Sequence, residues 1–212
     1  MSKESVRGKE VIIHFDGGRC IHSRNCVLDR PDVFVPNAPG EWIHPDRATP
    51  DEVAALARNC PSGAIRYERV DGSPDEAAPL VNTVRLRENG PLAFHAPLTL
   101  ANADEGFRVT LCRCGASARK PFCDGSHVKA GFSASGEAAA AESQPLAQRD
   151  GPLAIEPVKD GPLHLRGNFE LLTGSGRTIN RITEGWLCRC GQSRNKPYCD
   201  GSHKAAGFRS DS

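Results

Sequence analysis

A cysteine-rich segment occurs twice in this chain, and its two copies, residues 111–127 and 187–203, align without gaps. Each copy has the pattern Cys-x-Cys-x8-Cys-x3-His. The similarity extends outward, because a Gly-Phe pair follows each copy, at Gly131 and Gly207, and a Gly-Pro-Leu tripeptide precedes each, at Gly90 and Gly161. A repeat of this length predicts two similar structural units.

The spacing within each copy suits metal ligation. Side chains alternate faces in an extended segment, so Cys112 and Cys114 point the same way, and the glycine that follows permits a sharp turn. Cys123 and His127 are four apart, which places both on one face of a helical turn. Zinc and iron–sulfur clusters both accept three thiolates and an imidazole, so the spacing alone leaves both open. The candidate ligands are Cys112, Cys114, Cys123, His127, Cys188, Cys190, Cys199 and His203.

Cysteine usage favours metal sites over disulfides. The chain has nine cysteines against one methionine. Its first ten residues are polar and charged, without the apolar core of a secretory signal, and no later stretch has a membrane-spanning length. We therefore expect a cytoplasmic, reducing location and no membrane association. An odd number of cysteines would leave one thiol outside an all-disulfide scheme, whereas three groups of three leave none.

Charge and motif content limit the possible functions. The 27 basic and 26 acidic residues are mixed along the chain and give a formal net charge of +1, so no nucleic-acid partner is expected. Every thiol is accounted for as a ligand, and we identify no nucleophile–base pair and no phosphate loop. We therefore expect no catalytic residue and no enzyme activity.

The repeated segment resembles the CDGSH iron–sulfur domains, the mitoNEET type, at every motif position, including Ser117, Pro121, Ser193 and Pro197. That resemblance implies two [2Fe–2S] clusters, each held by the three cysteines and the histidine of one copy. It also implies two β-rich domains that form an intramolecular pseudo-dimer with a shared β-cap, and hence a monomer. One neutral imidazole in place of a thiolate makes the oxidised centre about one charge less negative, which raises its reduction potential.

The N-terminal cysteines resemble those of single-cluster bacterial ferredoxins, in which a loop supplies most ligands and a distant Cys-Pro supplies the last. Cys20 and Cys26 lie in the loop segment and Cys60 precedes Pro61. Ser23 stands where such ferredoxins have a further cysteine. The resemblance implies one [4Fe–4S] or [3Fe–4S] cluster, with His22 or Ser23 as a possible fourth ligand, and the alternative is a degenerate domain with three buried cysteines.

These patterns predict an α+β chain in four parts: a small ferredoxin-like domain at 1–76, CDGSH domains at 79–132 and 151–212, and a linker at 133–150, whose alanine run could also form a short helix. Strands are expected over 10–15, 64–70, 107–111 and 169–172. A helix is expected from Pro50 to about Asn59, with Thr49 as N-cap and Glu52 completing a capping box. Asp124 and Gly131 should begin and end a short helix. Phe122 and Tyr198 either shield the metal centres or pack in the core.

Three functions are consistent with these sites. The chain is an electron carrier working with an unidentified redox partner, a carrier or sensor that releases [2Fe–2S] to an apo-protein acceptor, or a structural zinc module for protein interactions. Three centres on one short chain favour electron transfer.

Overall fold

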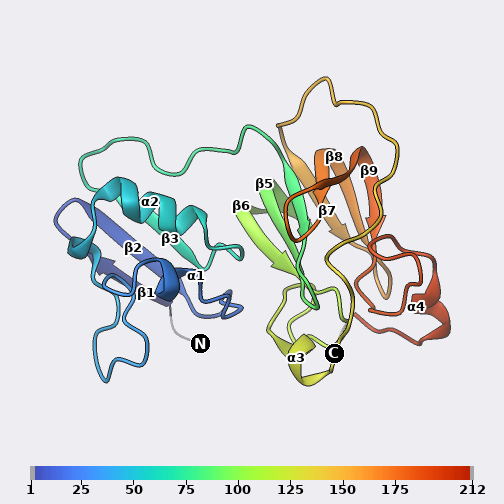
Figure 1. Ribbon diagram of the computed structural model, residues 1–212, viewed down its shortest axis with the longest axis horizontal. Coiled ribbons are helices and arrows are strands. Elements are labelled where there is room, and N and C mark those ends of the chain that lie inside the picture. Colours follow the sequence, from blue (N-terminus) through green and yellow to red (C-terminus); the bar gives the residue numbers. More distant parts are fainter. Residues whose placement is uncertain (1–2, 211–212) are drawn as a thin grey trace. The chain divides into compact units, whose positions relative to one another are not determined.

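The computed structural model describes residues 3–210 and forms two compact units, residues 1–77 and 78–212. Both units are rich in strands and have few, short helices (Figure 1). Within the described residues, no helix is long and apolar enough to cross a membrane.

The first unit contains a three-stranded antiparallel sheet in the order β1-β2-β3, with β1 at Lys3–Arg7, β2 at Val11–Asp16 and β3 at Ile65–Arg69. The strands expected over 10–15 and 64–70 are β2 and β3. In β2, Val11 and Ile13 are buried and face the core. Strand β1 was not predicted, because its sequence, Lys-Glu-Ser-Val-Arg, has too few apolar residues to show a strand pattern.

Two helices and a 3-10 turn complete the first unit: α1 at Asn25–Asp29, the turn at Pro45–Arg47, and α2 at Pro50–Arg58. The predicted capping box of α2 is confirmed. The Glu52 amide donates to Thr49 Oγ1 at 3.3 Å, and the Thr49 amide donates to Glu52 Oε2 at 2.8 Å. Helix α2 packs its buried face into the core of this unit. The helix ends at Arg58, two residues before Cys60, so its packing fixes where Cys60 lies.

In the second unit, each repeat contributes three strands. The first repeat contains β4 (Thr83–Leu86), β5 (Leu92–Leu100) and β6 (Ala103–Leu111), and the second contains β7 (Leu153–Pro157), β8 (Leu163–Leu172) and β9 (Thr178–Leu187). Strand β4 pairs antiparallel with β5 and parallel with β8, while β7 pairs antiparallel with β8 and parallel with β5. The first strand of each repeat therefore lies beside the second strand of the other, and both repeats contribute to one hydrophobic core.

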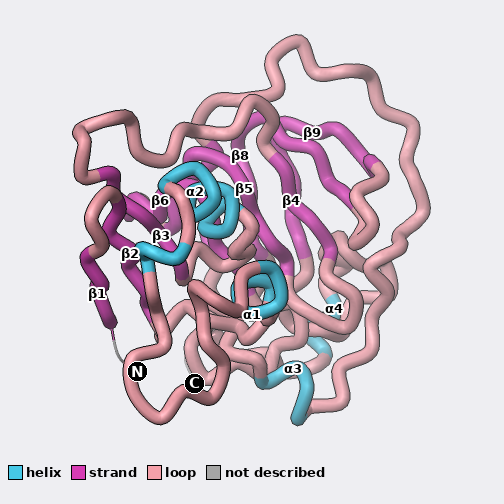
Figure 2. Tube along the Cα trace, turned by 60° about the vertical axis from the view of Figure 1, so that its left-hand side comes forward, coloured by secondary structure: helices cyan, strands magenta, loops and turns pink. Residues whose placement is uncertain are grey.

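The remainder of the second unit is mostly irregular, as Figure 2 shows, with two four-residue helices, α3 (Ser126–Lys129) and α4 (Ser202–Ala205). Residues 133–150 contain no helix, so the alternative of a helical alanine run is wrong. This connector is hydrogen-bonded to the repeats. The Gly136 amide donates to Glu88 Oε2 at 2.5 Å, and the Ala141 amide donates to the Ile179 carbonyl at 2.8 Å.

Candidate metal centres

In the first repeat, the predicted ligands lie together at the end of β6. Cys112 directly follows this strand, and its Sγ lies 3.6 Å from Sγ of Cys114. Sγ of Cys123 lies 3.5 Å from Nδ1 of His127. The four side chains therefore form two close pairs.

The second repeat has the same arrangement at the end of β9. The Sγ atoms of Cys188 and Cys190 are 3.6 Å apart, and Sγ of Cys199 is 3.4 Å from Nδ1 of His203. Among the described residues, no three His, Cys, Asp or Glu side chains are placed to hold a single metal ion. The structure instead groups the ligands two by two.

Backbone hydrogen bonds bring the distant third cysteine next to the first two. The Cys112 amide donates to the Pro121 carbonyl at 2.8 Å, and the Cys123 amide donates to the Thr110 carbonyl at 3.0 Å. The eight residues between Cys114 and Cys123 therefore fold back on the end of β6. Matching bonds, from Cys188 to Pro197 and from Cys199 to Trp186, form the second site.

The motif serines hold these loops closed. The Ser117 hydroxyl donates to the Phe122 carbonyl at 2.7 Å and accepts from the Arg119 amide at 3.0 Å. Ser193 makes the same pair of bonds, to the Tyr198 carbonyl and from the Asn195 amide. Both serines are buried, so each satisfies backbone groups that water does not reach.

The motif aspartates have a different role from the one predicted. Gly125 is the N-cap of α3 and makes no side-chain cap bond, so Asp124 as N-cap is wrong. Asp124 instead accepts from the Ser126 amide at 3.0 Å and from the Ala118 amide at 2.9 Å. It therefore joins the turn that carries His127 to the loop before Cys123. Gly131, with φ of 59°, ends the helix as predicted.

Phe122 and Tyr198 pack partly buried against the hydrophobic core. Of the two roles left open, core packing is the one the structure shows. The Tyr198 hydroxyl also accepts a hydrogen bond of 2.9 Å from Asn180.

The paired thiols ionise unequally. The hydrogen bond with Cys114 lowers the pKa of Cys112 to about 6, and the reciprocal bond raises the pKa of Cys114. Cys188 and Cys190 show the same division, with the pKa of Cys188 at about 6. The hydrogen bond within each pair therefore favours the thiolate form of the first cysteine, and thiolates are the form that binds soft metal ions.

Sequence reasoning missed how the arginine between the first two cysteines is held. Arg113 is 1 % exposed, and its guanidinium donates to the carbonyls of Gly90 at 2.9 Å, Arg87 at 2.7 Å and Ala134 at 2.8 Å. Arg189 is likewise buried and donates to the Gly161 carbonyl at 2.8 Å. Each arginine is thus a fixed, buried cation at the position between two ligand cysteines. The Gly-Pro-Leu tripeptide that precedes each copy could have indicated this contact, because its glycine carbonyl accepts the arginine's hydrogen bond.

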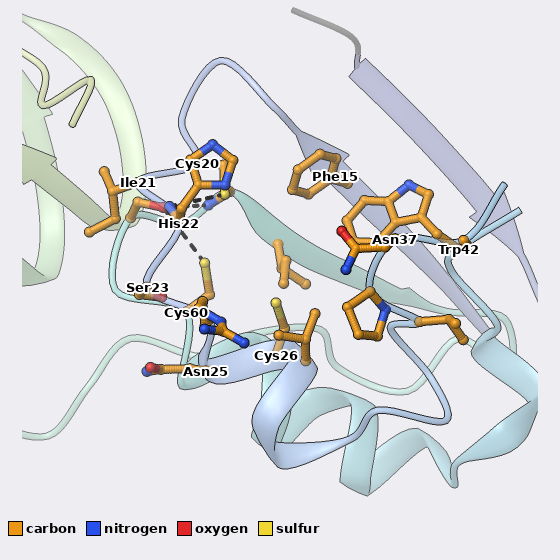
Figure 3. Close-up of a pocket in the computed structure, with 18 residues that line it drawn as sticks. Phe15, Cys20, Ile21, His22, Ser23, Asn25, Cys26, Asn37, Trp42 and Cys60 are labelled. Atoms are coloured by element: carbon orange, nitrogen blue, oxygen red, sulfur yellow. Dashed lines mark hydrogen bonds between the residues drawn. The ribbon is translucent and has the colours of Figure 1, made fainter. Parts of the chain in front are cut away.

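The N-terminal cysteines lie around one cavity of the first unit. Cys20 is in the loop after β2, Cys26 is in α1 and Cys60 follows α2. Figure 3 shows their sulfur atoms facing this cavity, which measures about 690 Å³. Burial raises the pKa of the Cys20 and Cys26 thiols.

Both proposed fourth ligands, His22 and Ser23, also line the cavity. The His22 backbone has φ of 54° and its amide donates to Cys20 Sγ at 3.4 Å. At the opposite end of the cavity lie Asn37 and the edge-to-face ring pair Phe15 and Trp42, whose centroids are 4.9 Å apart (Figure 3). Sequence reasoning did not single out this aromatic end.

The donor sets fit iron–sulfur clusters, and comparison with known proteins agrees. The family described as iron-binding zinc finger, CDGSH type, matches residues 82–128 and 160–204. The family described as divergent 4Fe-4S mono-cluster matches residues 6–70. The chain is therefore an iron–sulfur protein.

Two curated relatives cover different parts of the chain. The uncharacterized protein YjdI of Escherichia coli K12 is 34% identical over 61 residues, which are 28% of this chain and 78% of the relative. CDGSH iron-sulfur domain-containing protein 1 of the mouse is 28% identical over 89 residues, 42% of this chain and 72% of the relative, and its rat counterpart matches equally. This chain belongs to the CDGSH iron–sulfur domain family and carries a divergent 4Fe–4S domain at its N-terminus.

Proposed function

We propose that this chain binds two [2Fe–2S] clusters, one in each repeat through three cysteines and one histidine, and that it transfers electrons. The pairing of the ligands carries the proposal. Two ligands on one tetrahedral metal, with metal–sulfur bonds of about 2.3 Å, lie about 3.7 Å apart. Cys112 and Cys114, at 3.6 Å, are separated by about this ligand–ligand distance, and so are Cys123 and His127, at 3.5 Å. Each repeat thus has two ligand pairs, one for each iron atom of a two-iron centre.

The residues around each site favour an added electron. A bound [2Fe–2S] cluster supplies reversible one-electron chemistry. Cys112 and Cys188 are each 1 % exposed, so the strands and folded-back loops keep water from these ligands. Arg113 and Arg189 place buried positive charges between the ligand cysteines of the chain, and the neutral histidine ligand adds no negative charge. These two features favour the reduced state, whereas burial by itself disfavours the added negative charge.

A third centre is proposed in the N-terminal unit. Cys20, Cys26 and Cys60 line one cavity and would hold a [4Fe–4S] or [3Fe–4S] cluster, with His22 or Ser23 as the fourth ligand in the first case. With this centre the chain would carry three clusters. Three clusters in one chain suit the transfer of electrons to or from an unidentified redox partner.

The exchange of β4 and β7 between the repeats supports a further proposal, that the second unit is an intramolecular pseudo-dimer with a shared β-cap. A chain that contains both halves would act as a monomer. We propose a carrier role in the cytoplasm, without a catalytic residue, a nucleic-acid partner or a membrane.

A reductive titration under anaerobic conditions tests electron transfer. The visible absorption should bleach as reductant is added and return with an oxidant, over several cycles without loss of iron. Cys123→Ser and Cys199→Ser should each remove one [2Fe–2S] contribution, and Cys60→Ser should remove the third centre only. Absorption that is lost irreversibly in the first cycle would contradict an electron carrier.

Release of a cluster to an apo-protein is the second candidate. It is favoured by His127 and His203, which are only half-buried, whereas Cys112 and Cys188 are buried. Incubation with an apo-ferredoxin separates the two functions. A carrier should load that acceptor faster than it loses iron to a chelator of similar concentration, and an electron-transfer protein should not.

A further inference from the structure

The ligand loops of the two repeats meet inside the second unit. Cys114 and Cys190 are partners in an isolated antiparallel β-bridge, which places their α-carbons about 5 Å apart. Each of these cysteines belongs to a different site. The two sites therefore share one backbone junction, formed by Cys114-Gly115 and Cys190-Gly191.

The glycines of this junction make room for the opposite site. A β-carbon at Gly115 would lie 2.6 Å from the carbonyl oxygen of Cys190, and one at Gly191 would lie 2.6 Å from that of Cys114. Their φ values, 81° and 79°, independently favour glycine. Only the close contact links one repeat to the other, because the φ requirement would arise in an isolated loop as well.

A side-chain contact also crosses the junction. Lys120 Nζ of the first repeat lies 6.0 Å from the ring centroid of Phe208 in the second, and Phe208 packs with Cys188 and Cys190.

We propose that the two CDGSH sites are coupled through this junction, so that loading of one cluster raises the affinity of the other site. Gly115 is then a positioning residue for the second site, and Gly191 for the first. This inference rests on the proposed pair of [2Fe–2S] sites. A cluster bound to Cys114 orders that residue, and the bridge orders Cys190 with it, so the second cluster meets a loop that has already lost its conformational freedom.

Native mass spectrometry at limiting iron and sulfide tests the coupling directly. The full chain should carry Cys60→Ser, so that only the CDGSH sites load. At half loading, independent sites leave at least half of the molecules with one cluster, whereas a tenfold coupling lowers that fraction to about a quarter. A singly loaded fraction of one half or more would overturn the proposal. A chain that binds no cluster at all would instead refute the proposed function.

Two variants locate the coupling at the junction. In a chain whose first site is disabled by Cys123→Ser and His127→Ala, with Cys60→Ser, the visible absorption reports the second site alone. Gly115→Ala should then increase the rate of cluster loss to a chelator about tenfold. Gly131→Ala is the matched control, because its φ of 59° is also left-handed but no atom lies within 4 Å of the added β-carbon.

Equal rates of loss in Gly115→Ala and Gly131→Ala would overturn the role of the junction. The mirror pair, Gly191→Ala and Gly207→Ala, repeats the test on the first site in a chain with Cys199→Ser and His203→Ala. If Gly115→Ala does not fold, the loading distribution of the Cys60→Ser chain decides the proposal alone.

Discussion

The guanidinium Nε of Arg113 donates a hydrogen bond of 2.9 Å to the carbonyl oxygen of Gly90, and Arg189 makes the equivalent bond of 2.8 Å to Gly161. Each bond joins a Cys-x-Cys segment to the Gly-Pro-Leu turn of its own repeat. Phe132 and Phe208 each cover one guanidinium, with 5.4 Å from its carbon to the ring centroid. The repeated Gly-Pro-Leu and Gly-Phe sequences thus both hold the buried arginine.

Loss of this charge should lower the reduction potential of the first site. In Arg113→Gln, removal of a buried unit positive charge, at an effective dielectric of about 20, makes reduction less favourable by about 1 kcal/mol, or about 40 mV. A potentiometric titration of the visible absorption measures the shift. Lys129→Gln removes the same charge from an exposed position of the same repeat, where water and salt screen it, and should shift the potential far less. Equal shifts would contradict the role of burial.

Acid should release the clusters through their histidine ligands. A histidine must be neutral to bind iron. Burial lowers the pKa of His127 in the metal-free chain below the ordinary value of about 6.5. Protonation therefore favours the unfolded chain, and the stability that neutral His127 provides is present above about pH 6.5 and is lost as the pH falls below that value. His127→Cys should therefore retain its cluster at mildly acidic pH, while the second site of the same molecule bleaches. Absorption followed from pH 8 to 5 gives the result. A first site that bleaches at the same pH in His127→Cys as in the unchanged protein would contradict the role of this histidine.

The N-terminal centre should change type when it gains a thiolate. If it has three cysteine ligands, Ser23→Cys should stabilise a [4Fe–4S] form and remove any [3Fe–4S] signal from the electron paramagnetic resonance spectrum. Ser73→Cys, in the exposed turn after β3, is a control that adds a thiol away from the cavity. An unchanged spectrum in Ser23→Cys would exclude position 23 from the centre and leave His22 as the candidate ligand.

Asn82 should be required for the stability of the second unit. It is fully buried, and its side-chain amide donates to the carbonyls of Gly151 at 2.8 Å and Asn168 at 2.9 Å, which belong to the other repeat. Asn82→Ala leaves two carbonyls without these donors and should reduce the free energy of unfolding by about 2–4 kcal/mol. Denaturant unfolding measures it. A loss below about 0.5 kcal/mol, as expected for a surface change such as Gln144→Ala, would contradict this role.

Local patterns in the sequence predicted much of this structure. The capping box of Thr49 and Glu52, strands β2 and β3, and the terminating Gly131 are all present as expected. These features depend on neighbouring residues, so short-range periodicity and cap preferences reveal them.

The features that were missed depend on residues far apart in the chain. The approach of Gly115 to Cys190 joins the two repeats and leaves no local pattern, and a pairing of strands between the repeats was expected only from the family resemblance. The carbonyl contacts of Arg113 come from two separate segments, one of them the predicted linker. Asp124 was assigned as an N-cap because the residue type fits, but its bond to Ala118 depends on how the loop folds back.

The measurement that tests the central claim most directly is the iron, sulfide and zinc content of the protein purified without air, together with its visible absorption. The paired ligands of both repeats predict a coloured protein with equal amounts of iron and sulfide and little zinc, and a chain carrying Cys60→Ser should keep four iron atoms, from two [2Fe–2S] clusters of two irons each. A colourless protein with about one zinc ion per repeat and no sulfide would contradict the account, and would identify the repeats as structural zinc sites.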